Sequence, residues 1–203
     1  MNQKLNISYL GKRDYIDVST LSSALYEALP LITENGKIKN LKIRLIKKVE
    51  NECFLQLFKD SDNSTPKNIP GTAVIFNWDF EGVNYTAFFV EGEKTLNSRI
   101  KEIVDDPQEH IRYENGVVTI FNPINDDCIY NLMKMGRLIV VNKYNLYPRV
   151  VRFHFDRLFN KQEMKNIVMK AEVFSATKNF YKLETFKDGI KFGEIIIKGL
   201  DPY

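Results

Sequence analysis

The sequence predicts an α+β protein in which one kind of unit occurs twice along the chain. Three observations indicate this: most apolar residues recur with the two-residue period of strands, two segments carry the apolar stripe of a helix, and a hairpin pattern of the first half returns in the second. The 203 residues, 44% hydrophobic and 27% charged, suffice for one large or two small domains and exclude a disordered chain.

A strand and then a helix open the first half. Leu5, Ile7 and Tyr9 alternate with polar residues, which predicts a half-buried strand. Asp17 or Ser19 can cap the helix that follows. The stripe of this helix, which stops just before Pro30, consists of Leu21, Ala24, Leu25, Ala28 and Leu29.

Four strands follow in two predicted hairpins. The first hairpin covers residues 41–58 and has its polar tip at residues 50–51, and the second covers residues 72–91 and turns at residues 81–82. Residues 60–71 between them contain two prolines and are predicted to form a surface loop.

Residues 93–115 differ in character and are predicted to connect two halves. Their sequence EKTLNSRIKEIVDD predicts a short charged helix, which Pro107 breaks. The expected units are therefore residues 1–92 and residues 116–203, with residues 93–115 as the connector.

The second half is predicted to repeat this order of elements. After a strand at Val118, a helix begins that Asn125 caps, with Asp126 and Asp127 in its first turn, where the helix dipole favours negative charge. Its apolar stripe contains Ile129, Leu132 and Met133.

A strand at residues 151–156 and a final hairpin that turns at Asp188 and Gly189 complete the second half. Gly189 lies 107 positions after Gly82, and the apolar residues behind both glycines match without a gap. The order of elements around this match favours a structural repeat.

Residues 160–174 fit two structures. Ile167, Met169 and Ala171 have the spacing of a strand, whereas Asn160 and Glu163 fit the capping pair of a helix. The repeat favours the strand.

Composition indicates a cytoplasmic protein. No apolar run approaches the ~18–20 residues that span a bilayer, and no apolar segment typical of a secretion signal follows the first lysine. Cys53 and Cys128 lie far apart in apolar segments, which favours buried free thiols over a disulfide or a metal site.

The net charge of +3 is weakly basic, but basic residues concentrate between Lys37 and Lys48. This cluster could attract an acidic partner, although alternating basic and apolar residues are also typical of the solvated face of a strand.

The order of a strand, a striped helix and four strands, with LKIRLIKKVENECFLQLF after the helix, resembles the hot-dog fold of acyl-thioester hydrolases and hydroxyacyl dehydratases. The segments VRFHFDRLFNKQEMKNIVMKAEVF and KDGIKFGEIII are similar to the same pattern. The resemblance implies two tandem hot-dog-like units, each a curved antiparallel sheet wrapping one helix. It also implies an acyl chain carried on coenzyme A or on the phosphopantetheine of acyl carrier protein, and no tightly bound cofactor.

The same resemblance points to three candidate catalytic residues. Asp17 lies where some hot-dog thioesterases present a carboxylate, and Asp127 with Asn131 is similar to the acid half of a tandem dehydratase site. His154 is the third candidate, although it shares a strand face with two charged residues and a solvated histidine is typical there. Helix capping and dipole complementarity explain the two aspartates without any function.

The leading hypothesis is therefore an acyl-thioester-binding protein of lipid or polyketide metabolism, either dehydratase-like or thioesterase-like. Acyl carrier protein, or another subunit of a biosynthetic assembly, would be its partner, and a homo-oligomer fits this hypothesis. A catalytically inactive binding or assembly subunit is the alternative, because the chain has only two histidines.

A small nucleic-acid-binding module is a weaker alternative that draws on the basic residues and on aromatic residues of the first half. Glycine-rich phosphate loops, C-x-x-C pairs, H-x-x-x-H metal pairs and nucleophile elbows are absent from the sequence.

Overall fold

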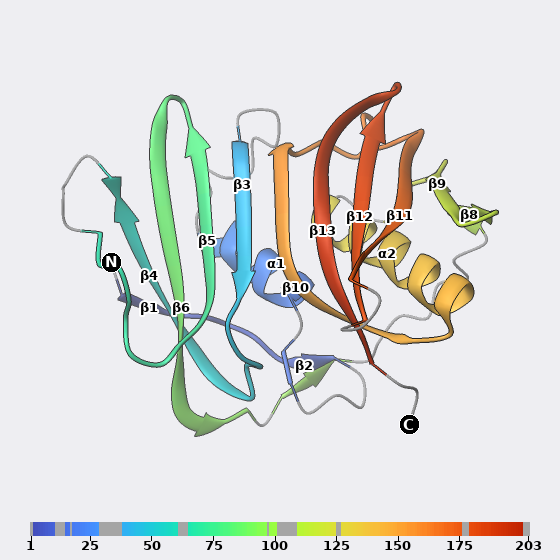
Figure 1. The fold of residues 1–203 in the computed structure, drawn as a ribbon. Coiled ribbons are helices and arrows are strands. Elements are labelled where there is room, and N and C mark those ends of the chain that lie inside the picture. Colours follow the sequence, from blue (N-terminus) through green and yellow to red (C-terminus); the bar gives the residue numbers. More distant parts are fainter. Residues whose placement is uncertain are drawn as a thin grey trace. The chain divides into compact units, whose positions relative to one another are not determined.

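The chain forms two compact units, which we describe separately. Unit 1 comprises Met1–Val104 and unit 2 comprises Asp105–Tyr203 (Figure 1). The computed structural model describes residues 2–10, 15–16, 18–28, 38–60, 65–96, 98–100, 109–124, 127–175 and 179–200. Neither helix in these ranges is long and apolar enough to cross a bilayer.

In its described residues, unit 1 combines one helix with a five-stranded antiparallel sheet of order β1-β4-β6-β5-β3. A separate parallel pair joins β2 and β7. The elements are β1 (Asn2–Lys4), β2 (Tyr9–Leu10), α1 (Val18–Ala28), β3 (Ile38–Leu45), β4 (Asn51–Lys59), β5 (Thr72–Phe80), β6 (Val83–Thr95) and β7 (Arg99–Ile100).

The described part of unit 2 combines one helix with a six-stranded antiparallel sheet of order β10-β13-β12-β11-β9-β8. The elements are β8 (Ile111–Glu114), β9 (Val117–Ile120), α2 (Cys128–Tyr144), β10 (Tyr147–Arg157), β11 (Ile167–Ser175), β12 (Phe180–Lys187) and β13 (Ile190–Leu200).

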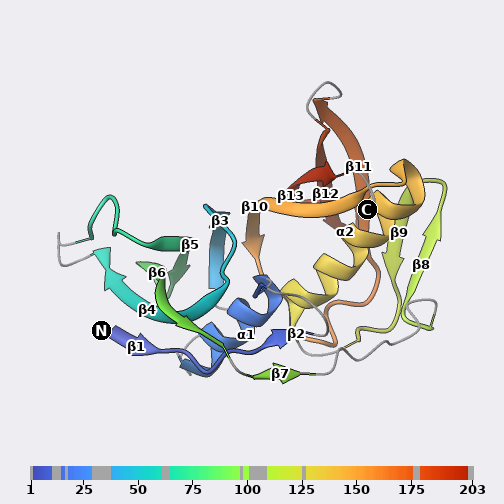
Figure 2. The same ribbon diagram turned by 90° about the horizontal axis from the view of Figure 1, so that it is seen from below.

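Each helix lies on one face of its own sheet, behind the strands as Figure 1 is drawn and below them in Figure 2. We call this face inner and the opposite face outer. Alternate residues of the strands fill the inner faces, because successive side chains of a strand point to opposite sides. The fully buried inner side chains include Ile43, Leu55, Phe76 and Phe89 in unit 1, and Phe153, Phe155, Met169 and Leu183 in unit 2.

Two glycines allow close packing in unit 2. A Cβ atom on Gly136 of α2 would lie 3.0 Å from Leu183 Cδ1 and 3.4 Å from Ile197 Cδ1, so the helix backbone comes close to the sheet. A Cβ atom on Gly193 would lie 2.2 Å from Phe155 Cδ1, so only glycine leaves room for this buried ring.

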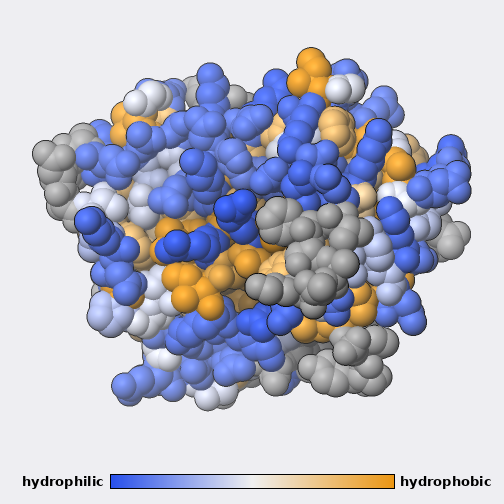
Figure 3. All heavy atoms as spheres, viewed as in Figure 1, coloured by the Kyte–Doolittle hydropathy of each residue, from blue (hydrophilic) through white to orange (hydrophobic). Residues whose placement is uncertain are grey.

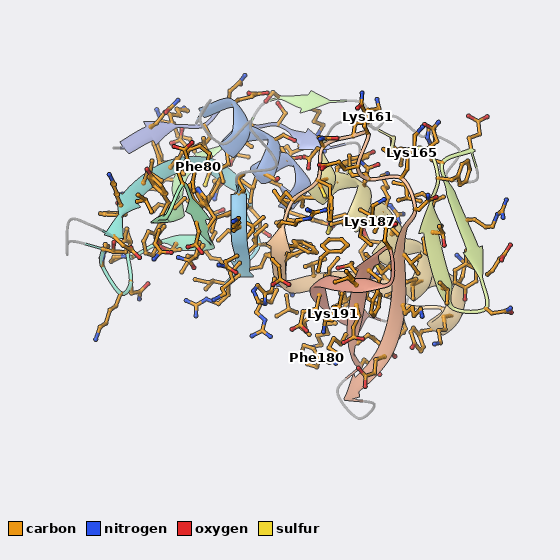
Figure 4. The ribbon with its side chains drawn as sticks, turned by 90° about the horizontal axis from the view of Figure 1, so that it is seen from above. Phe80, Lys161, Lys165, Phe180, Lys187 and Lys191 are labelled. Atoms are coloured by element: carbon orange, nitrogen blue, oxygen red, sulfur yellow. The ribbon has the colours of Figure 1, made fainter. Side chains whose placement is uncertain are left out.

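Paired charges cover the outer face of unit 2. Glu172, Lys182, Glu184, Lys191, Glu194 and Arg152 form a chain of ion pairs across β11, β12, β13 and β10. The nitrogen–oxygen distances along this chain run from 2.6 Å for Lys182–Glu172 to 3.6 Å for Arg152–Glu194. Figure 4 labels Lys191 within this group. We call these six residues the charge ladder.

Both predicted hairpins with a glycine turn are confirmed. β5 pairs with β6 through Glu81 and Gly82, and β12 pairs with β13 through Asp188 and Gly189. All four turn residues have positive φ, between 50° and 81°, which is the geometry of the type I′ turn that joins twisted strands well.

The hairpin predicted over residues 41–58 is wrong. β3 pairs with β5, whereas β4 pairs with β1 and β6, so the two strands are not neighbours. The chain between them is held elsewhere: Val49 is buried and accepts a hydrogen bond of 2.7 Å from the Ile16 amide, and Glu91 of β6 binds the amides of Glu50 and Asn51. These contacts carry the chain across instead of folding it back.

Of the two structures predicted for residues 160–174, the strand is confirmed from Ile167 onward, because Ile167–Ser175 forms β11. The capping pair also forms, because the Asn160 amide donates to Glu163 Oε2 at 3.1 Å and the Glu163 amide donates to Asn160 Oδ1 at 3.0 Å. It closes a single stretch of turns instead of a helix. Asn166, at φ 63°, ends the stretch and donates from its amide to Ile120 O at 2.7 Å.

Two further expectations need correction. The predicted charged helix after residue 92 is wrong where the structure describes it, because residues 93–95 continue β6 and Arg99–Ile100 forms β7; residues 101–108 lie outside the described ranges. The two halves repeat in the succession of their elements but not in sheet order. In unit 1 the hairpin strand β6 has β4 as its other neighbour, and in unit 2 the hairpin strand β13 has β10. By its place in the chain, as the first strand after the helix, β10 corresponds to β3 and not to β4.

Candidate functional site

Of the predicted catalytic carboxylates, Asp127 lies within the described residues, at the start of α2. Asp127 is the N-cap of this helix, with φ −81° and ψ 108°, and its Oδ1 accepts a hydrogen bond of 3.1 Å from the Tyr130 amide. The predicted cap, Asn125, lies outside the described residues, and Asp127 takes the role instead of standing in the first turn. The helix dipole favours a negative charge at this position.

Asn131 fixes the chain that leads into the helix. Its side chain is 1% exposed, its Oδ1 accepts from the Ile124 amide at 2.8 Å, and its Nδ2 donates to the Asp127 carbonyl at 2.8 Å. Both ends of the amide therefore bind backbone. In the D-x-x-x-N pair, Asp127 is the half-buried carboxylate and Asn131 holds it in place.

His154 lies on the outer face of β10. Its neighbours Phe153 and Phe155 are fully buried on the inner face, whereas His154 is 37% exposed and its Nε2 lies 3.9 Å from Asp156 Oδ1. Because α2 packs against the inner face, the structure does not bring His154 and Asp127 together. The predicted shared face of His154 and Asp156 agrees with this geometry.

Two other sequence positions, Asp17 and His110, give less support for a catalytic site. Asp17 lies outside the described residues, between the buried residues Ile16 and Val18. His110 lies in the turn before β8, and its Nδ1 is 2.9 Å from the carbonyl of Asn122, so backbone occupies that nitrogen.

Sequence reasoning missed Glu91, a carboxylate of unit 1 that has several hydrogen-bond partners. Its side chain is 8% exposed, and it lies 2.6 Å from Lys47 Nζ, 2.6 Å from the Glu50 amide and 2.9 Å from the Asn51 amide. Burial by itself would raise the pKa of Glu91, but these hydrogen bonds outweigh it and hold the pKa below its usual value. The sequence signal is weak, because the partners of Glu91 lie 40 residues earlier.

Both cysteine thiols are expected to be unreactive in the folded protein. Burial raises the pKa of Cys53 to about 12, and Glu91 opposite it on β6 adds to the effect. Burial likewise raises the pKa of Cys128 to about 12. The thiolate is the reactive form, so neither cysteine suits a nucleophile in the folded protein. The described part of the chain also contains no cluster of residues that could hold a metal ion.

Four aromatic residues of β5 and β6 are core residues. Phe76, Trp78, Phe88 and Phe89 are each at most 3% exposed. Stacking on nucleic-acid bases needs open ring faces, so these four residues provide no such platform.

Comparison with solved structures shows the fold. The tesB protein of Mycobacterium avium subs paratuberculosis is 5% identical, with a TM-score of 0.50, over 96% of this chain and 91% of that one. The 12:0-ACP thioesterase from Umbellularia californica is 6% identical, with a TM-score of 0.50, over 98% of this chain and 96% of that one. A conserved protein of unknown function with hot dog fold from Alicyclobacillus acidocaldarius is 12% identical, with a TM-score of 0.44, over 100% of this chain and 93% of that one.

These similarities define an α+β protein dominated by antiparallel sheet. The chain has a hot-dog fold. No family model and no curated protein matches the sequence.

Proposed function

We propose that this protein binds acyl thioesters carried on coenzyme A or on acyl carrier protein and hydrolyses them. The hot-dog fold over nearly the whole chain carries this proposal, because one of the similar structures described above, with a TM-score of 0.50, is a 12:0-ACP thioesterase. Activity in the cytoplasm, in lipid or polyketide metabolism, is part of the proposal, as is the absence of a tightly bound cofactor.

The division of the chain is also part of the proposal. We propose that residues 1–92 and 116–203 are tandem hot-dog-like units joined by residues 93–115. The shared succession of one helix and four following strands supports this, while the different sheet order makes unit 2 a variant of the plan.

Asp127 is the proposed catalytic carboxylate of unit 2, and Asp17 is the proposed one of unit 1. A thioesterase needs a carboxylate that activates water or attacks the thioester carbonyl. Asp127 supports this role because the cap geometry and Asn131 fix its position at the positive end of α2. His154 is left out of the proposed mechanism because its ring lies on the outer face.

Hydrolysis is favoured over dehydration. A hydroxyacyl dehydratase commonly uses a histidine as its base. Here one histidine contacts a backbone carbonyl and the other lies on the outer face, so neither is placed for that role.

The test is a panel of acyl-CoA and acyl carrier protein thioesters of increasing chain length, with release of free thiol as the signal. Asp127→Asn is the informative variant, because asparagine caps helices as well as aspartate does and only the dipole contribution of the charge, at most about 1 kcal/mol of stability, is lost. We expect thiol release to fall at least about a hundredfold in this variant if Asp127 acts as base or nucleophile. Glu172→Gln is the control, since it removes an exposed carboxylate of unit 2 that lies in the charge ladder on the outer face.

Unchanged turnover in Asp127→Asn and in Asp17→Asn would remove both carboxylates from the proposal. Absence of turnover in the unaltered protein, together with measurable binding of a non-hydrolysable acyl thioether, would favour the inactive binding subunit. The observation that favours this second function is that Asp127 caps α2, a role that explains its position without catalysis.

A further inference from the structure

The outer face of β3 in unit 1 carries cations that the rest of the described chain leaves unpaired. Lys42 and Arg44 point outward and are exposed, while Leu41 and Ile43 between and beside them are buried on the inner face. Ile46 follows at the end of the strand and is 49% exposed. We call Lys42, Arg44 and Ile46 the β3 row.

The structure shows which residues of the basic cluster between Lys37 and Lys48 have partners within the chain. Lys47 binds Glu91 at 2.6 Å, Lys48 lies over the ring of Tyr15, and Lys39 is opposite Asp79 in the register of β3 and β5. These three lysines have partners or an opposite charge within the chain. Lys37 lies outside the described residues.

Lys42 and Arg44 have no such partner. Asn77 and Ile75 stand opposite them on β5, and no carboxylate of the described residues lies within ion-pair distance of either cation. On the outer face of unit 2, by contrast, each cation of the charge ladder has a carboxylate.

An apolar group borders the two cations. Ile46 lies beside them in sequence and is exposed, whereas Ile75, which faces Arg44 across the strand pair, is only 7% exposed, so Ile46 provides most of the apolar contact. In Figure 3, hydrophobic side chains gather over the lower ends of β3 and β5, next to strongly hydrophilic ones. The surface therefore combines positive charge that the described residues do not neutralise with a small apolar contact, which suits an acidic protein surface that carries an apolar residue among its carboxylates.

Other occupants fit less well. Lipid surfaces recruit clusters of about four to eight basic residues, and the row has two. Single-stranded nucleic acid needs aromatic rings for stacking, and the β3 row contains no aromatic residue. The phosphates of coenzyme A would use the cations but not the apolar group.

We infer that the β3 row is the docking surface for an acidic carrier protein that delivers the acyl thioester. This inference rests on the proposed function and deepens it, because it selects the carrier-bound substrate over the coenzyme A form. The row acts through charge steering and a small apolar contact, so it changes the encounter with the carrier and leaves the chemical step alone.

The experiment compares three dodecanoyl thioesters, on acyl carrier protein, on coenzyme A and on pantetheine, which lacks the charges of the other two. The variant is Lys42→Glu with Arg44→Glu, and the control is Lys67→Glu with Lys165→Glu, which makes the same charge change at two exposed positions that are not part of the row. Figure 4 labels Lys165 in the turn region before β11.

We expect KM for the carrier-bound substrate to rise at least about tenfold in the row variant, with kcat unchanged and with the pantetheine thioester unaffected. We also expect the wild-type KM for the carrier-bound substrate to rise with salt and this dependence to weaken in the variant. Equal losses in the control, or equal losses with coenzyme A, would overturn the inference.

Binding of the carrier protein, measured by calorimetry, separates this inference from the proposed function. Absence of hydrolysis of all three thioesters by the wild type would contradict the proposed function. Carrier binding that the row variant weakens and the control preserves would still support the docking surface. Carrier binding that is absent in the wild type, or unchanged in the row variant, would refute it.

Discussion

Glu91 shows how one side chain joins three parts of unit 1. From β6 it holds the ammonium group of Lys47 and the amide of Glu50, which lie between β3 and β4, and the amide of Asn51, the first residue of β4. Hydrogen bonds to a charged group contribute about 1.5–3 kcal/mol each when they are well shielded from water. The carboxylate therefore fixes where the chain crosses from one strand to the other.

We predict that Glu91→Gln lowers the free energy of unfolding by about 1–3 kcal/mol at neutral pH. The folded-state pKa of Glu91 is lowered, so its contribution is present above the ordinary glutamate pKa and is lost as pH falls through the folded-state value. The difference between variant and wild type should consequently shrink on acidification. Urea unfolding at neutral and acidic pH measures this, with the exposed Glu93→Gln as the matched control. A difference that grows toward acidic pH would contradict the assignment.

Among the elements, the two type I′ turns offer a direct comparison. The first left-handed position is Glu81 in unit 1 and Asp188 in unit 2, and glycine follows in both. Aspartate and asparagine adopt this conformation readily, whereas longer side chains are disfavoured there.

We predict that Glu81→Asn raises the free energy of unfolding by about 0.5–1 kcal/mol, because asparagine relieves the strain of the left-handed backbone. Asp188→Asn, the matched change in the other turn, should have almost no effect. Thermal unfolding of the two variants beside the wild type measures the difference. Equal shifts in both variants would show that the backbone conformation at Glu81 is not the cause.

Elements with local signals could be predicted from the sequence. Each turn dipeptide identified its hairpin, and the 11-residue span of α1 follows from its stripe. The pairing of β3 with β5 could not be predicted, because the ladder depends on contacts between residues far apart, such as Ile43 with Phe76. In the same way the cap at Asp127 has a local signal, while the partners of Glu91 reach it only through the folded sheet.

At the scale of the whole molecule, each unit has its own core and its own buried thiol. Cys53 lies on β4 of unit 1 and Cys128 lies at the start of α2 in unit 2. The two cysteines therefore report separately on the opening of the two units.

We predict that neither thiol reacts with a thiol reagent in the native protein and that both react after unfolding, because burial excludes the reagent and raises both pKa values to about 12. Labelling of Cys53→Ala and Cys128→Ala at increasing urea concentration then measures the opening of each unit. Different urea dependences would show two units of unequal stability, and coincident ones would show a single cooperative transition. Rapid labelling in native buffer would contradict the burial of that cysteine.

β8 has a consequence for how the protein avoids misassembly. It is the outermost strand of the unit 2 sheet, it has only four residues, and its side chains Arg112 and Glu114 are about 70% exposed and charged. A foreign strand that tried to extend the sheet at this border would find few open backbone groups and would have to desolvate charge. The short, charged border therefore discourages fibril growth from unit 2 during synthesis and storage.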